Sequence, residues 1–78
     1  MFTRACIINT KANLNTVCDA TAAMSMATVL NGLTEVIFID VDNEVGATNY
    51  YLDGALVGAV QAGGMWGPEL TAIIEANK

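Results

Sequence analysis

The sequence predicts one α+β domain over residues 1–78, with the element order βαβββα and a mixed four-stranded sheet carrying two helices. The first observation is the run of residues 36–39, which is β-branched or aromatic throughout and favours a strand buried on both faces. The second is Asp53-Gly54 between two apolar runs. This pair is typical of a two-residue hairpin, because a type I′ turn needs positive φ at both central positions.

The N-terminal part predicts a strand, a polar loop and a helix. Residues 2–8 are expected to form the strand, and residues 9–13 the loop. The helix is expected from about Leu14 or Thr16 to Leu30, because apolar residues recur there at spacings of three and four. The predicted apolar face consists of Val17, Ala20, Met24, Ala27 and Leu30.

Both ends of this predicted helix have local signals. Asn13 or Asn15 can cap its start, since a short amide side chain accepts from exposed first-turn N–H groups. Gly32 can take the left-handed position that ends it. The opposite face carries no Lys or Glu and is therefore a candidate contact surface. Its polar residues are Thr21, Ser25 and Thr28.

The second half predicts three more strands and a short helix. The central strand covers residues 36–41, and the hairpin arms begin at residues 49 and 55. Gly58 inside the second arm indicates a bulge or a close backbone approach. Pro68 suits the first turn of a helix that reaches about Ala76. Because a helix separates the first two strands, they are expected to be parallel through a right-handed crossover.

Composition limits the classes of partner. Eight acids against Arg4, Lys11 and Lys78 give a formal charge of −5, which argues against direct nucleic-acid binding because that requires clustered cations. Charged residues make up 14% of the chain, against about 25% in typical domains. Either the twelve alanines inflate the apolar share of 54%, or a partner covers part of the apolar surface. Both readings remain open at this point.

The cysteines and the uncharged stretches predict a location. Cys6 and Cys18 follow no secretory signal, which favours two thiols over a disulfide. The longest uncharged stretches, residues 20–34 and 54–68, are shorter than the 18 or so residues of a membrane span. The expected location is the cytoplasm, or a particle assembled there, and no membrane partner is expected.

The sequence offers no catalytic set and one weak metal candidate. The chain has no histidine, which removes the commonest nucleophile pairs and metal ligand. Asp40, Asp42 and Glu44 alternate as calcium ligands do. A helix-loop-helix calcium site needs glycine next and glutamate at the last position, where this chain has Val45 and Tyr51. Solvated acids at a strand end are therefore favoured, and no cofactor is expected.

Four large side chains are candidates for a binding surface, because aromatic residues dominate interface energetics. In a strand Tyr50 and Tyr51 point to opposite faces, so at most one is expected to be fully buried. One tyrosine together with Trp66 is predicted to make contacts. The full candidate set is Tyr50, Tyr51, Met65 and Trp66.

The segment from Tyr50 onward, about a third of the chain, resembles the C-terminal half of thioredoxin-like proteins. The matching residues are Tyr51-Leu52-Asp53-Gly54-Ala55-Leu56-Val57-Gly58, Glu69-Leu70 and Ile73-Ile74-Glu75-Ala76-Asn77. The family's Cys-x-x-Cys is absent, since Cys6 and Cys18 lie twelve residues apart. Its proline before the hairpin is replaced by residues 46–48. The resemblance therefore implies a fold relationship and no dithiol redox chemistry.

Three functions remain open. The first is a non-enzymatic protein that acts by binding itself or a larger protein partner. Small viral and phage accessory proteins, whether shell components or inhibitors of host machinery, share its small size and scarce charge. The second is a thioredoxin- or glutaredoxin-like redox protein that uses Cys6 or Cys18, which requires a reactive thiol. The third is a small-ligand or divalent-cation binder at Asp40, Asp42 and Glu44.

Overall fold

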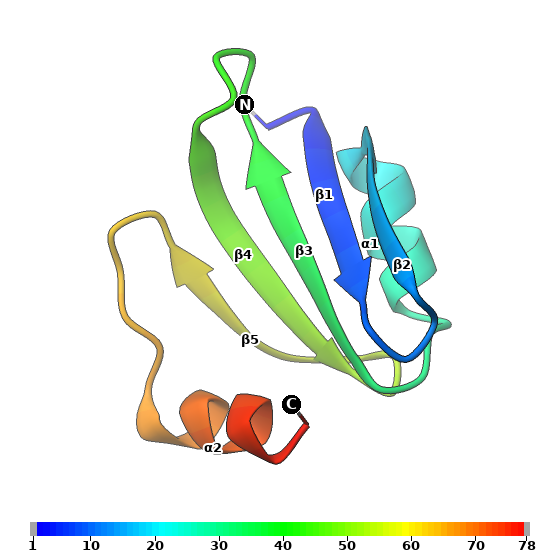
Figure 1. Ribbon diagram of the computed structural model, residues 1–78. Coiled ribbons are helices and arrows are strands. Elements are labelled where there is room, and N and C mark those ends of the chain that lie inside the picture. The colour runs from blue at the N-terminus through cyan, green and yellow to red at the C-terminus, as the bar shows by residue number, and fades with distance from the viewer. Residues whose placement is uncertain (1, 78) are drawn as a thin grey trace.

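A five-stranded antiparallel sheet with one helix on each face makes up the fold, which a computed structural model describes for residues 2–77. The strand order across the sheet is β2-β1-β3-β4-β5, as Figure 1 shows. The elements along the chain are β1 (Arg4–Asn9), β2 (Leu14–Asp19), α1 (Ala20–Ala27), β3 (Leu33–Ile39), β4 (Val45–Leu52), β5 (Ala55–Gln61) and α2 (Pro68–Ala76).

The strand β2 corrects the predicted fold. Residues 14–19 pair with β1 in unbroken antiparallel register, from Asn9 opposite Leu14 to Arg4 opposite Asp19. Cross-strand pairing of β-branched side chains thus outweighs the helical spacing of the same residues. Because β2 reverses the chain once more, β3 returns antiparallel to β1. The predicted parallel crossover, the mixed four-stranded sheet and the order βαβββα are therefore wrong.

The helix α1 begins where β2 ends, at Asp19. One carboxylate oxygen of Asp19 accepts hydrogen bonds from the backbone N–H groups of Thr21 (2.9 Å) and Ala22 (3.3 Å). This capping satisfies first-turn donors that have no partner within the helix. The predicted caps Asn13 and Asn15 lie earlier; Asn13 has a φ of 53° in the turn between β1 and β2.

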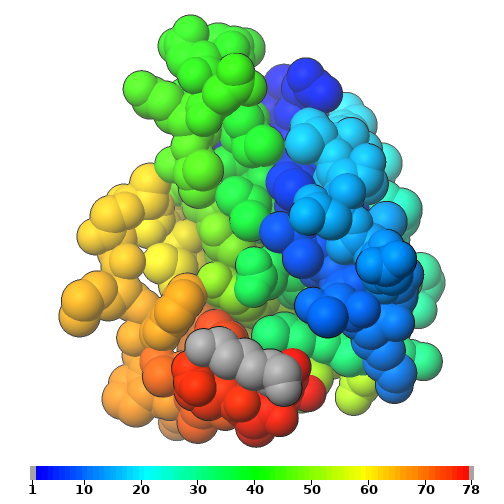
Figure 2. Space-filling view, in the orientation of Figure 1, coloured from blue at the N-terminus to red at the C-terminus, as the bar shows by residue number. Residues whose placement is uncertain are grey.

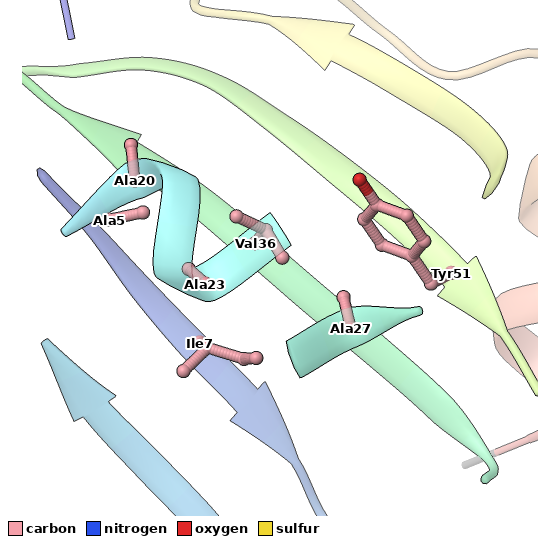
Figure 3. Close-up of a cluster of buried hydrophobic side chains, with 7 residues drawn as sticks. All are labelled: Ala5, Ile7, Ala20, Ala23, Ala27, Val36 and Tyr51. Carbon is pink, nitrogen blue, oxygen red and sulfur yellow. The ribbon is translucent and has the colours of Figure 1, made fainter. Parts of the chain in front are cut away.

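The main core lies between α1 and the sheet. Small alanines let the helix approach the strands closely, and Figure 3 shows them facing β1, β3 and β4. Burying Ile7 and Val36 completely contributes about 1.5–3 kcal/mol each. The buried members of this core are Ala5, Ile7, Ala20, Ala23, Ala27, Val36 and Tyr51.

The predicted β4–β5 hairpin is confirmed. Asp53 and Gly54 both have positive φ, 50° and 88°, as a type I′ turn requires. The register shifts between Tyr50 and Tyr51, so β5 contains a bulge at this point. A Cβ added at Gly58 would lie 2.9 Å from a methyl carbon of Leu70. The predicted bulge at Gly58 is therefore confirmed, and the close neighbour at this glycine is a side chain of α2 and not another backbone segment.

The helix α2 has the predicted bounds and packs on the sheet face opposite α1. Leu70 and Ile74 form a second core with Tyr50, to which Leu33, Val57 and Val60 contribute. Pro68 stands at the start of α2 and Glu69 in its first turn, where a carboxylate complements the positive helix end. The sheet at β4 is therefore covered from both sides, whereas β5 has no fully buried residue.

Candidate interaction surfaces

The structure buries both tyrosines that the sequence proposed as contacts. Tyr50 is 5% exposed and Tyr51 6% exposed, so the expectation that at most one would be fully buried is wrong. The two side chains do point to opposite faces, but a helix covers each face at this point of β4. Neither tyrosine is available to a partner without a rearrangement of the core.

Tyr50 nevertheless links the second core to the surface through Trp66. The two rings meet edge to face, with centroids 5.6 Å apart and planes at 88°. This geometry is favoured by the ring quadrupoles. Burial raises the pKa of the Tyr50 phenol, and the negative charge of Glu35 raises that pKa further. Trp66 is thus held in place by a buried partner, although it lies in a glycine-rich loop.

The loop between β5 and α2 presents an apolar surface. Met65 is 94% exposed and Trp66 43% exposed. Beside them lies an open hollow of about 360 Å³. We call this region the Trp66 loop surface, lined by Val60, Gly64, Met65, Trp66 and Thr71.

A second uncharged surface follows β2 and α1. Thr21, Ser25 and Thr28 are all exposed, as the sequence predicts for the outer face of the helix. The Thr28 hydroxyl donates a 2.7 Å hydrogen bond to the carbonyl of Ser25 and so is satisfied within the helix end. We call this region the β2–α1 surface. Its exposed members are Asn15, Thr16, Val17, Thr21, Ser25 and Thr28, of which Asn15 and Val17 point to the sheet face opposite α1.

Sequence reasoning missed the β2 part of this surface because it assigned those residues to the helix. Thr16 and Val17 are exposed on a strand at the edge of the sheet, and Val17 retains 46% of its surface. Asp19 followed by helix-forming alanines was the available signal, since Asp is a preferred N-cap residue. That signal places the helix start after residue 19.

A polar groove of about 440 Å³ lies at the end of the sheet near the C-terminal end of α2. Lys11, Glu35 and Asp53 contribute charges of both signs to its lining. One carboxylate oxygen of Asp53 accepts a 2.8 Å hydrogen bond from the backbone N–H of Gly32. Part of its hydrogen-bonding capacity is therefore committed to joining the β4–β5 turn to the chain before β3.

Of the three acids named as weak metal candidates, Asp40 uses its side chain to organise a turn. One oxygen of Asp40 accepts hydrogen bonds of 2.9 Å from the backbone N–H groups of both Asp42 and Glu44. Asp42 and Glu44 are exposed. Within residues 2–77, no group of three or more His, Cys, Asp or Glu side chains is arranged to hold a metal ion.

The two thiols lie on opposite faces of the sheet. Cys18 is opposite Ala5 and packs against the α1 core, whereas Cys6 is opposite Val17 on the other face. Alternate side chains of a strand point in opposite directions, so these two sulfurs cannot form an internal disulfide without rebuilding β1 or β2. The Cys6 thiol donates a weak hydrogen bond, at 3.5 Å, to the side-chain oxygen of Asn15.

Comparison with known proteins adds no relative: no family model, curated protein or solved structure matches the chain. The helices described within residues 2–77 are too short to span a bilayer.

Proposed function

We propose that this chain is a non-enzymatic protein that acts by association, with a larger protein partner or with itself, in an accessory, structural or inhibitory role. The carrying observation is the distribution of charge and exposed apolar surface. None of the eleven charged residues lies in residues 20–34 or 54–68. These uncharged segments carry large exposed side chains, namely Val29 (79%), Leu56 (57%), Met65 (94%) and Trp66 (43%).

Physical chemistry favours a covered state for these segments. Grouped apolar side chains next to uncharged backbone typically mark a contact surface, whereas scattered ones need no explanation. In the Trp66 loop surface, Met65 and Trp66 are adjacent in sequence and border the same hollow. A flexible methionine beside a held aromatic ring is a common composition of protein interfaces.

The overall charge supports a protein partner. A net charge of −5 repels nucleic acids and anionic lipid surfaces, while a neutral or basic protein surface can approach. The proposal includes a location in the cytoplasm, or in a particle assembled there. The two free cysteines, which face away from each other, are compatible with such reducing surroundings.

The test is quantitative cross-linking of the tagged wild-type protein and its variants in the native source of the protein. The amount of cross-linked partner that is recovered with each of them is compared. Met65→Asp should reduce the recovered partner at least tenfold, because it places a charge in the centre of the Trp66 loop surface. Val41→Asp is the matched control, since Val41 is also apolar and 86% exposed but lies in the acidic turn. Equal loss in both variants, or a wild-type protein that is monomeric and cross-links to nothing, would contradict the proposal.

A further inference from the structure

The two edges of the sheet differ in how they are protected against pairing. An edge strand presents unpaired N–H and C=O groups, and proteins usually blunt it with a bulge, a charge, a proline or a covering segment. On β5 the register is interrupted by a bulge next to Gly58. The loop that follows β5 runs beside its end on the way to α2, as Figure 1 shows. The β5 edge is therefore blunted.

The β2 edge has no bulge, no cationic residue and no proline, and α1 lies behind it on one face of the sheet only (Figure 1). Its register with β1 is continuous over all six residues. The strand contains no lysine, arginine or proline, and its residues 15–17 are exposed. In Figure 2 the β2 residues line one side of the molecule, with no helix over the face that is visible there. The backbone of β2 is thus available for addition of a further strand.

The only charged residue of β2 is already engaged. Asp19 directs its carboxylate into the first turn of α1, where it accepts from Thr21 and Ala22. The whole segment 14–28, about a fifth of the chain, contains no other charge. For a protein of net charge −5, this is a side where two copies can meet without opposing carboxylates.

On these observations we propose that the β2 edge pairs antiparallel with the β2 edge of a second copy of this chain, joining two five-stranded sheets into one. The inference rests on the proposed function, because it names the partner for one of the two surfaces. Antiparallel pairing centred on Thr16 places each Thr16 opposite its counterpart and each Asp19 just beyond the start of the other β2, so the two carboxylates lie roughly 20 Å apart. Parallel pairing would set them side by side.

A stable dimer needs a contact larger than one paired strand. A standard interface buries about 800 Å² on each partner, which is about a sixth of the 4858 Å² that the chain exposes. Strand pairing alone covers less than this. The neighbouring α1, which follows β2 directly, would add its exposed and uncharged Thr21 and Ser25 to the contact. Two-fold symmetry brings the same residues from both copies to the contact.

The experiment is light scattering on the full chain over a wide concentration range. The wild type should reach about twice the 8.2 kDa of one chain. Thr16→Lys should raise the dimer dissociation constant at least tenfold, because two lysines then face each other across the edge. Ala59→Lys is the matched control: Ala59 is also exposed and central in an edge strand, on β5, and this variant should remain dimeric.

A mixing experiment separates loss of pairing from loss of folding. Thr16→Glu alone should also be monomeric, and mixing it with Thr16→Lys should restore a heterodimer through opposite charges at the edge. Circular dichroism should be unchanged in both variants. A wild type that is monomeric throughout overturns the inference, as does a dimer that Ala59→Lys dissociates and Thr16→Lys leaves intact. The proposed function survives in two cases. In the first, a dimer forms but is dissociated by Ala59→Lys and not by Thr16→Lys; in the second, the protein binds another partner through Met65.

Discussion

The side-chain amide of Asn9 donates a 2.7 Å hydrogen bond to the hydroxyl of Thr34, and both side chains are fully buried. The same amide nitrogen donates to the carbonyl of Asn31 at 2.8 Å, and its oxygen accepts from the N–H of Ala12 at 2.8 Å. One buried polar side chain therefore ties together the β1–β2 turn, the segment after α1 and the start of β3.

Removing either partner should destabilise the fold. Asn9→Ala leaves buried donors and acceptors unsatisfied and should lower the free energy of unfolding by about 1–3 kcal/mol. Thr34→Val, which keeps the shape, should cost less because Asn9 retains two other partners. Urea unfolding of both single variants and the double variant measures the coupling. Additive effects in this cycle would mean that the Asn9–Thr34 hydrogen bond adds nothing to stability.

Alkaline pH should weaken the fold through Tyr50. The folded protein holds the pKa of this phenol above its usual value of about 10, first because of burial and second because of the charge of Glu35. Above about pH 10 the unfolded chain loses the proton first, so stability is complete below that pH and falls as pH rises through the folded pKa.

Glu35→Gln should lower the pKa of Tyr50 while leaving it above the usual value, since burial remains. Tyrosinate absorbance measured in a Tyr51→Phe background reports Tyr50 alone. A Tyr50 titration that Glu35→Gln leaves unmoved would exclude the electrostatic contribution of Glu35 and leave burial as the whole cause.

Gly54 should be far less replaceable than Gly63, although both have positive φ, 88° and 76°. A Cβ at Gly54 would lie 2.5 Å from the carbonyl oxygen of Thr28, whereas a Cβ at Gly63 would meet nothing within 4 Å. Gly63→Ala should cost about 1 kcal/mol from backbone strain, and Gly54→Ala clearly more. The difference between the two variants in thermal unfolding isolates the close approach. Equal losses would mean that backbone strain alone accounts for both.

A smaller side chain at position 70 should offset the loss of stability caused by a larger one at position 58. Gly58→Ala should destabilise the fold by about 1–3 kcal/mol, because the new methyl group crowds Leu70 beneath α2. In a Leu70→Ala background the same substitution should cost much less. Gly67→Ala provides a control with open space around it. A full cost at Gly58 in both backgrounds would show that the bulge, not α2, excludes the side chain.

Local signals predicted the hairpin and the last helix well, but the central strand less so: β3 spans Leu33–Ile39 and not residues 36–41, and its residues 37–39 are only half-buried. The sequence signals for the turn are Asp53 and Gly54, and those for the last helix are Pro68, Leu70 and Ile74. Because these signals lie within the elements themselves, both elements can be predicted without knowledge of their distant contacts. The strand β2 could not be read in this way. Its residues fit a helical spacing, and the pairing with β1 that decides the matter is not encoded within residues 14–19.

The candidate surfaces likewise divide into those that local sequence predicts and those that depend on the topology. The exposure of Met65 and Trp66 follows from their glycine-rich surroundings and was predictable. The burial of Tyr51 depends on where α1 lies, which only the complete topology determines. The exposed edge at Thr16 was hidden for the same reason as the strand that carries it.

Asp19 is at once the last residue of β2 and the cap of α1, with no slack of chain between them. A displacement of the outer strand β2 is therefore transmitted directly to α1. A partner bound along β2 would therefore act directly on the helix whose alanines pack against the sheet.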